Sequence, residues 1–227
     1  MMKKPELQPR LRMLADLVPP GARLADIGTD HGYVPVTLLL EGKIPSAIAS
    51  DIAEEPLQHA RRTAEEYGIE TGLSFRHTAG LTGYQSGEAD CYLIAGMGGE
   101  TIEHILDAAP WMSEEDALLI LQPQTKQEEL RLWLSENGYR IEKERLALDK
   151  QVLYNIFLVR GGECRKLSEP EAYCGIGLSE DPLYGQFIEK QVRRLTQTLE
   201  GLRRAKGENG ARIEALTKLI GELEGEL

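Results

Sequence analysis

The clearest indication of the fold is one stretch of the sequence, Leu24-Ala-Asp-Ile-Gly-Thr-Asp-His-Gly-Tyr33. An apolar run ends in the acid Asp26, Gly28 follows, and a short polar turn leads into a helical pattern. This order is typical of the first strand, loop and helix of a nucleotide-binding α/β sheet. A second acid, Asp51, closes the next apolar run, at roughly the 20-residue spacing from the glycine at which a carboxylate holds a ribose. The sequence therefore predicts a ligand site over the first two strands.

The glycine pattern of this loop does not fit a dinucleotide. The pattern G-x-G-x-x-G would need a glycine at position 30, where the sequence has Asp30. A carboxylate at that position repels a pyrophosphate and attracts a positively charged ligand. The sulfonium cation of S-adenosylmethionine therefore suits the loop better than a nicotinamide dinucleotide does. The alternative is a tight strand-to-helix turn that binds no ligand.

Composition limits the class of protein. The chain has 227 residues, is 41% hydrophobic and carries a net charge of −11, which predicts one α/β domain with an appendage. The negative charge argues against non-specific binding to nucleic acid, but it is compatible with a local basic patch. We find no leader-like or membrane-spanning apolar stretch, so a cytoplasmic protein is expected. The three cysteines lack paired spacing and the four histidines are scattered, so reduced thiols and no metal site are expected.

Strands and helices alternate as far as residue 137, which is typical of a mostly parallel sheet covered by helices on both faces. The last two strands have no helix between them and are expected to form an antiparallel hairpin around Asp149-Lys150. Five parallel strands followed by such a hairpin match the Rossmann-like, seven-stranded class I methyltransferase sheet, in which strand seven inserts beside strand five. The expected strands are 23–28, 46–51, 72–76, 89–95, 116–121, 139–147 and 152–160, and the expected helices are 6–18, 33–41, 54–67, 99–109 and 126–137.

The pattern changes after Gly161-Gly162, which predicts a domain boundary. Two apolar heptad seams follow, joined by a polar turn at 206–210, as in an antiparallel helical hairpin or coiled coil. The expected domains are a cofactor-binding domain over residues 1–162 and the helical hairpin over residues 163–227. Basic residues on the first tail helix could hold RNA phosphates. The alternatives are a solvated face balanced by glutamates, and self-association through the hairpin. The seams are Ile188, Val192, Leu195, Leu199 and Leu202, and then Ile213, Leu216, Ile220, Leu223 and Leu227.

Ligands of open α/β sheets bind over the carboxyl ends of the strands, so the residues that follow each expected strand are the candidates. The run Ala95-Gly-Met-Gly-Gly99 follows the fourth strand, directly before a helix. Three glycines in four positions allow a flat ligand to approach the backbone closely. The alternative is a glycine-rich turn without a ligand.

Further motifs occur in the same order along the chain: Leu121-Gln-Pro-Gln124, Leu130-Arg-Leu-Trp-Leu134 and Gly138-Tyr139. Together with Asp26-Ile-Gly-Thr-Asp-His-Gly-Tyr-Val-Pro35 and the glycine run, they resemble the TrmK family of bacterial tRNA (adenine(22)-N1)-methyltransferases. The resemblance covers about residues 7–160, and residues 182–227 fit the coiled-coil tail of that family by pattern. It implies an enzyme that uses S-adenosyl-L-methionine to methylate tRNA.

The resemblance also implies roles for individual residues. Asp26 and Gly28 would border the methionine part of the cofactor, Asp51 would hold the ribose hydroxyls, and Gly80 would lie by the adenine. Ala79 stands where the family commonly has Asp or Asn, so its side chain cannot accept a hydrogen bond from the adenine amino group. The expected cofactor-binding residues are Asp26, Gly28, His31, Tyr33, Asp51, Ile52, Ala79, Gly80, Leu81, Ala95, Gly96 and Met97, and the expected substrate-binding residues are Arg10, Gly98, Gln122, Arg193 and Arg194.

Asp30 is the expected catalytic residue. N1 of adenine already carries a lone pair, so it needs no deprotonation before it attacks, and methylation leaves the base cationic. A nearby carboxylate stabilises that charge and can later accept a proton from the amino group. The alternative role of Asp30 is to cap the following helix.

Two alternative functions remain open at this point. A small-molecule methyltransferase with the same cofactor site is favoured by the acidic net charge and disfavoured by the helical hairpin. A non-catalytic protein that binds S-adenosylmethionine is favoured by Ala79 and disfavoured by the intact Asp26, Asp30 and Asp51.

Overall fold

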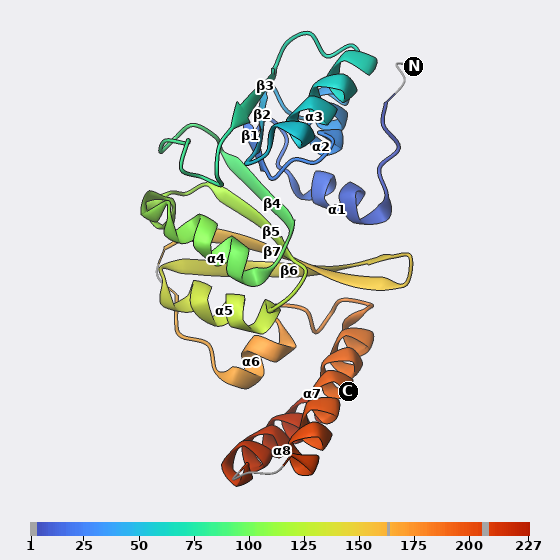
Figure 1. Ribbon diagram of the computed structural model, residues 1–227, viewed down its shortest axis with the longest axis vertical. Coiled ribbons are helices and arrows are strands. Elements are labelled where there is room, and N and C mark those ends of the chain that lie inside the picture. Colours follow the sequence, from blue (N-terminus) through green and yellow to red (C-terminus); the bar gives the residue numbers. More distant parts are fainter. Residues whose placement is uncertain (1–3, 163, 206–208) are drawn as a thin grey trace.

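Seven strands form one sheet in the order β3-β2-β1-β4-β5-β7-β6 (Figure 1). The structure is a computed structural model, and it describes residues 4–162, 164–205 and 209–227. The first five strands are parallel, and β7 runs antiparallel between β5 and β6. The predicted class I methyltransferase sheet is therefore confirmed. The strands are β1 (Leu24–Ile27), β2 (Ala47–Asp51), β3 (Leu73–His77), β4 (Cys91–Met97), β5 (Leu118–Pro123), β6 (Tyr139–Asp149) and β7 (Val152–Gly161).

The helices lie on both faces of this sheet and in a C-terminal tail (Figure 1). Two short elements were not expected from the sequence, η1 and α6, because one or two turns are too short for a helical period to show. The helices are α1 (Pro9–Leu17), α2 (Tyr33–Leu40), α3 (Glu54–Glu66), α4 (Gly99–Asp107), η1 (Pro110–Glu114), α5 (Gln127–Glu136), α6 (Glu169–Cys174), α7 (Tyr184–Arg204) and α8 (Gly210–Glu224).

Side chains on β1 alternate between the two faces of the sheet. Ala25 and Ile27 belong to the core beneath α4 and α5, whereas Leu24 belongs to the core beneath α1 and α2. The period of two therefore places Asp26 on the α1–α2 side, at the carboxyl end of its strand. Leu93 of β4 lies in the same core as Leu24. One face of the sheet thus carries both an apolar wall and a carboxylate at the edge where ligands bind.

The hairpin between β6 and β7 turns one residue later than expected. Asp149 pairs with Val152, so the two turn residues are Lys150 and Gln151, with φ angles of 46° and 65°. Positive φ at both central residues is what a tight two-residue hairpin requires, because it matches the right-handed twist of the strands. Since β6 runs parallel to β5, this turn lies at the same edge of the sheet as the ends of β1 and β4.

A buried ion pair fastens the segment that leads to the tail. Arg131 of α5 donates two hydrogen bonds to Glu144 of β6, at 2.8 and 2.7 Å, and both side chains are fully buried. Glu144 also accepts hydrogen bonds from the side chain of Asn155 and the backbone N–H of Ile176, and Arg131 donates to the carbonyl of Ala172. Removing either charged partner would leave the other charge buried and unpaired.

The tail packs on the β6–β7 hairpin. Leu146 of β6 and Leu153 of β7 join a core cluster with the seam residues of α7 and α8. Lys190 of α7 donates a hydrogen bond to the carbonyl of Leu153 at 3.3 Å. The middle of the expected turn, residues 206–208, lies outside the described residues. The boundary at Gly161-Gly162 stays a prediction. Among the residues that the structure describes, none of the helices has the length and apolar character to cross a bilayer.

Candidate functional site

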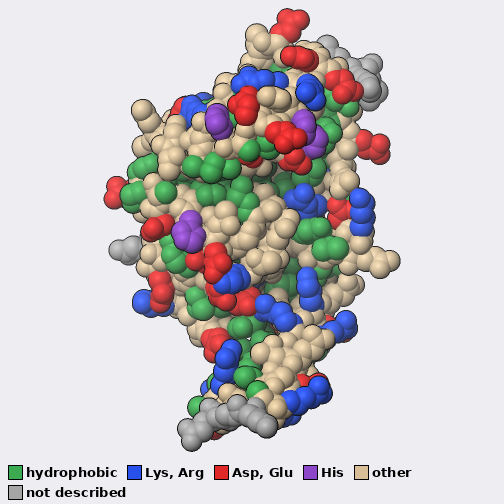
Figure 2. All heavy atoms as spheres, in the orientation of Figure 1, with side chains coloured by type: hydrophobic (Ala, Val, Ile, Leu, Met, Phe, Trp, Pro, Cys, Tyr) green, Lys and Arg blue, Asp and Glu red, His purple; other side chains and the backbone are tan. Residues whose placement is uncertain are grey.

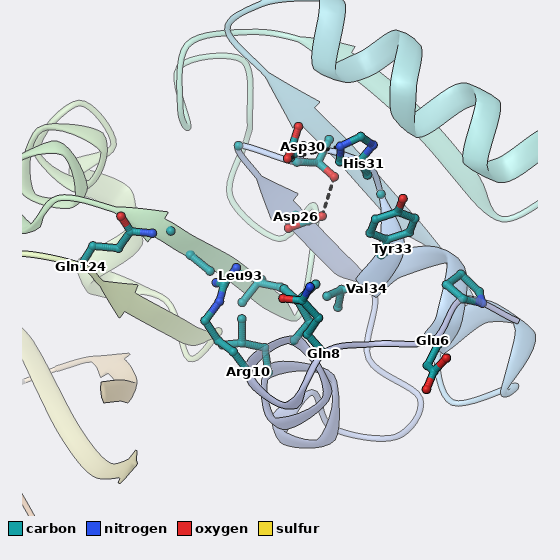
Figure 3. A pocket seen from close by; sticks show the side chains of 18 of the residues that line it. Glu6, Gln8, Arg10, Asp26, Asp30, His31, Tyr33, Val34, Leu93 and Gln124 are labelled. Carbon is teal, nitrogen blue, oxygen red and sulfur yellow. Dashed lines mark hydrogen bonds and ion pairs between the residues drawn. The ribbon is translucent and has the colours of Figure 1, made fainter. Parts of the chain in front are cut away.

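A cavity of about 720 Å³ opens at the carboxyl ends of β1 and β4 (Figure 3). Its walls come from the loop after β1, the end of β4, α1 and the segment that precedes α1. Among its lining residues are Asp26, Gly28, Asp30, His31, Tyr33, Ala95 and Gly96, all predicted site residues. Arg10, also predicted, lies on α1 and faces the cavity from the side opposite Asp26 and Asp30 (Figure 3).

A second cavity of about 290 Å³ lies on the other side of Gly28. It collects further predicted residues from the ends of β2, β3 and β4, and Gly28 lines both cavities. The backbone of Gly28 has a φ of 75°, and a Cβ there would lie 2.0 Å from Cε of Met97. The positive φ favours glycine at this junction, and any larger residue would also have to displace the end of the Met97 side chain. The predicted residues around the second cavity are Gly28, Asp51, Ile52, Ala79, Gly80 and Met97.

Asp26 is the buried carboxylate of the first cavity, with 9% of its surface exposed. Burial raises the pKa of Asp26 to about 6, the hydrogen bond that Thr29 Oγ1 donates at 2.7 Å opposes this rise, and the negative charge of Asp51 adds to it. A carboxylate held in this way gains most from a cation that enters the cavity.

The loop after β1 turns sharply above Asp26. The backbone N–H groups of Gly28 and Thr29 both donate to the carbonyl of Ser50, at 2.8 and 2.9 Å. Gly32, with a φ of 65°, is the N-cap residue of α2. The alternative in which Asp30 caps this helix is therefore wrong. The carboxylate of Asp30 is instead 79% exposed and lies 3.5 Å from Nε2 of His31.

Asp51 and Ile52 form the far wall of the second cavity. Oδ1 of Asp51 accepts a hydrogen bond from the N–H of Ala53 at 2.8 Å, which fixes the carboxylate at the strand end. Oδ2 has no hydrogen-bond partner within the described ranges of the chain. The side chain of Ile52 is apolar and 70% exposed, so it offers an apolar face to a ligand. Leu81, predicted to lie by the adenine, is 1% exposed and packs in the core beneath the loop.

The glycine run after β4 shapes the boundary between the sheet and α4. The register with β5 shifts between Ala95 and Met97, so Gly96, with a φ of 81°, bulges out of the strand. Bulges of this kind are frequent next to active sites, because they redirect the backbone. Gly98 is the N-cap residue of α4, and a Cβ on Gly99 would lie 2.6 Å from the carbonyl oxygen of Lys126.

Arg10 and Gln122 form one unit. Arg10 Nη1 donates a hydrogen bond of 2.9 Å to Oε1 of Gln122, and its guanidinium lies 5.4 Å from the centre of the Tyr154 ring. Gln122 is fully buried, so it positions Arg10 from behind. Gln124, two residues on, is exposed and lines the cavity. Gln124 is not among the predicted binding residues, although its place after β5 puts it at the ligand edge. Glu6, Gln8 and Tyr67 also line the cavity and have no motif that could have indicated them.

Arg193 and Arg194 lie on α7, apart from both cavities. Arg194 pairs with Glu128 of α5 at 2.8 Å and stacks over Tyr173. It lines a separate cavity of about 400 Å³ between α5, α6, α7 and α8. Arg193 is exposed. The structure thus brings Arg10 to the cofactor edge and leaves these two arginines on the tail.

The histidines are less scattered than the sequence suggested. His59 of α3 stacks on His31, with ring centres 4.9 Å apart and an interplanar angle of 8°. Asp30 lies beside them, and one ligand atom from each of the three residues falls within 4.8 Å of the others. The expectation that the histidines are scattered is therefore wrong for this pair. The two histidines are 28 positions apart in the sequence, so only the packing of α3 beside α2 brings them together.

The fold and the site define a class I methyltransferase, the class that uses S-adenosylmethionine. Residues 7–157 match the family model described as a methyltransferase domain. The tRNA (adenine(22)-N(1))-methyltransferase of Bacillus subtilis (strain 168) is 35% identical over 204 residues, which cover 88% of this chain and 84% of that protein. The chain belongs to the family of tRNA (adenine(22)-N1)-methyltransferases, which confirms the resemblance seen in the motifs.

Solved structures agree over nearly the whole chain, tail included. The crystal structure of the B. subtilis m1A22 tRNA methyltransferase TrmK superimposes with a TM-score of 0.85 at 28% identity and covers 97% of this chain and 98% of its own. Sp1610 of Streptococcus pneumoniae, solved with S-adenosyl-L-methionine, gives a TM-score of 0.84 at 31% identity and covers 98% and 100%.

Proposed function

We propose that this chain transfers a methyl group from S-adenosylmethionine to N1 of adenine 22 in tRNA. The observation that carries the proposal is the pair of cavities that meet at Gly28, with Asp26 in one and Asp51 in the other. An elongated ligand with a cationic end and a ribose finds a carboxylate for each of these groups. Family membership supplies the tRNA substrate and its position.

The residues present fit such a ligand. Asp26 would attract the ammonium group of the methionine part, and Oδ2 of Asp51 would accept hydrogen bonds from the ribose. Ile52 and Gly80 would enclose the adenine by apolar contact. Ala79 lacks an acceptor in its side chain, so contact with the adenine amino group would come from the backbone. When bound, S-adenosylmethionine supplies the methyl group, and its sulfonium sulfur is the leaving group.

Asp30 is the residue that we assign to the chemistry. Its side chain is exposed and lines the same cavity as Asp26 and Ala95, and Gly28, which lines both cavities, lies in the same loop. The attacking N1 of adenine lies on the pairing edge, so the base must leave its stack to reach the cavity. As N1 takes the methyl group, the base becomes cationic, and the carboxylate of Asp30 stabilises that charge. It can then accept a proton from the amino group.

The direct test is methylation of unmodified tRNA. A methyl group on N1 blocks base pairing, so reverse transcription is expected to stop beside position 22 after incubation with enzyme and cofactor. A tRNA with guanine at position 22 is the matched control and should give no new stop. Cofactor binding without methylation of any tRNA would favour a non-catalytic protein that binds S-adenosylmethionine. Turnover on small molecules alone would favour a small-molecule methyltransferase.

Arg10 is expected to contact a tRNA phosphate at the mouth of the cavity. Arg10→Ala should lower kcat/KM for tRNA roughly 10-fold. It should also reduce the slope of log kcat/KM against log salt concentration by about one, because one phosphate contact is lost. Gln122→Ala should reproduce a part of this effect by releasing the guanidinium. Steady-state kinetics at several salt concentrations measure both variants.

Arg12→Ala is the matched control, because Arg12 lies on the same helix but pairs with Asp16 and Glu41. Equal losses in Arg10→Ala and Arg12→Ala would show that the effect comes from α1 as a whole and not from a contact with tRNA.

The tail is proposed as a second contact for tRNA. Figure 2 shows Lys and Arg side chains gathered over the part of this face where α7 and the β6–β7 hairpin lie. On α7, Arg193 is exposed, whereas Arg194 is engaged with Glu128. A folded RNA that places one base in the cavity is large enough to reach α7. The domain of residues 1–162 would then bind the cofactor and the flipped base, and the domain of residues 163–227 would bind the body of the tRNA.

A further inference from the structure

Three side chains with metal-ligating atoms converge beside the larger cavity, and two of them, Asp30 and His31, line it. Asp30 and His31 come from the loop after β1, and His59 comes from α3. One ligand atom from each lies within 4.8 Å of the other two. Ligands that surround one ion at bond lengths of about 2.0–2.2 Å lie at most about 4.4 Å apart, so the three ligand atoms must move slightly closer together. Because the stacked rings of His31 and His59 are nearly parallel, one imidazole must also rotate out of the stack before both rings direct a nitrogen at one ion.

The cluster has an unsatisfied polar atom. Nδ1 of His59 is buried and has no hydrogen-bond partner among the described residues. A buried nitrogen without a partner costs free energy, which a bound ligand or a rotation of the ring toward one would recover. His31 and Asp30 are reachable from solvent, with 39% and 79% of their side chains exposed. An ion can therefore enter without unfolding any element.

We propose that Asp30, His31 and His59 bind one divalent transition-metal ion. Two imidazoles and one carboxylate are a ligand set that suits Zn²⁺, Co²⁺ or Ni²⁺, and it leaves the remaining coordination positions to water. Mg²⁺ and Ca²⁺ favour oxygen ligands and are not expected to compete. One consequence rests on the proposed function. An ion bound to Asp30 occupies the carboxylate that would otherwise stabilise the flipped base, so metal binding inhibits methyl transfer.

The site is tested by titrating the full chain with Co²⁺ in the absence of tRNA. We expect one equivalent to bind, with visible absorption typical of nitrogen and oxygen ligands. His59→Ala should weaken this binding at least 10-fold, because it removes one of three ligands. His104→Ala is the matched control, since His104 is exposed on α4, outside the cluster. Thermal unfolding checks that both variants are folded.

Three results would overturn the site. These are the absence of one-to-one binding, an affinity that is unchanged in His59→Ala, and a thiolate charge-transfer band that assigns the ion to Cys164 or Cys174. Each is read without tRNA, so a failure of the metal site and a failure of the proposed function remain distinguishable.

The consequence for activity has its own readout. Zn²⁺ at saturation should suppress methyl transfer by the unaltered chain, and a chelator should restore it. For His59→Ala, compared with its own rate in metal-free buffer, the same Zn²⁺ concentration should have little effect. Equal inhibition of both proteins would overturn the inhibitory role of the ion.

Discussion

Asp30→Ala is expected to lower the rate of methyl transfer about 100-fold and to leave the affinity for S-adenosylmethionine within about twofold. The carboxylate of Asp30 is 79% exposed, and Gly32 caps α2 in its place, so its loss should not disturb the fold. Stabilisation of a developing charge and proton transfer by one side chain typically contribute at least this factor. The effect should appear in kcat, because the positive charge on the base exists only as the methyl group is transferred.

Single-turnover methylation of tRNA and calorimetric titration with the cofactor measure the two halves of this prediction. Asp30→Asn separates charge from shape, since the amide keeps the size of the side chain but cannot accept a proton. We expect it to be almost as slow as the alanine variant. Turnover close to that of the unaltered chain in either variant would remove Asp30 from the mechanism.

Much of this site could be predicted because parallel sheets bring strand ends to one edge. Gly28 and Asp51 end up around the two cavities because each follows a strand whose apolar pattern is plain in the sequence. The parallel pairing of the first five strands followed from their alternation with helices, and the antiparallel pairing of β6 with β7 followed from a hairpin with no helix inside it. The place of β7 beside β5 followed from the match of this pattern to the class I methyltransferase sheet. These are local signals, and each has one structural solution.

The features that escaped prediction depend on packing between distant segments. His59 meets His31 only because α3 lies beside α2, and no spacing rule links the two positions. The sequence left open the alternative that Asp30 caps α2, because the choice between Asp30 and Gly32 depends on where the loop ends, and helix boundaries carry little signal. Leu81 follows β3 as predicted, but the direction of one side chain in a turn sends it into the core instead of the cavity.

Asp26→Asn is expected to weaken the binding of S-adenosylmethionine about 100-fold while it stabilises the protein without ligand. Removing one member of a close, largely buried charge pair costs a few kcal/mol of binding free energy, about 2–5 kcal/mol in comparable interfaces. In the absence of ligand, the same carboxylate destabilises the folded chain. Burial raises the pKa of Asp26 from 3.8 to about 6, so its ionised form is less stable in the folded chain than in the unfolded chain.

The direction of the pH effect follows from this shift. At pH 7 Asp26 is ionised in both states, and the folded state bears a cost of about 1–3 kcal/mol that an asparagine would not bear. As pH falls through about 6 and on toward 3.8, the folded chain takes up a proton before the unfolded chain does, and the cost disappears. The stability gain of Asp26→Asn should therefore be largest above pH 6 and should vanish near pH 4. Thr29 can still donate its hydrogen bond to the amide oxygen of the variant.

Cofactor affinity should also depend on the titration of Asp26, but protonation should lower the affinity whereas it removes the cost in stability. For the unaltered chain it should decline as pH falls through about 6, because protonation removes the charge that attracts the ligand. For Asp26→Asn the affinity should be low and nearly independent of pH in this range. Denaturant unfolding and calorimetry from pH 4 to pH 8 supply both curves. Asp51→Asn is the control, expected to weaken binding with a much smaller gain in stability, because the charge of Asp51 is the smallest contribution to the raised pKa of Asp26. The burial that raises the pKa of Asp26 also strengthens its attraction for a cationic ligand in this cavity. If Asp26→Asn were less stable than the unaltered chain at pH 7, burial would not be destabilising the carboxylate, and this explanation of cofactor binding would be wrong.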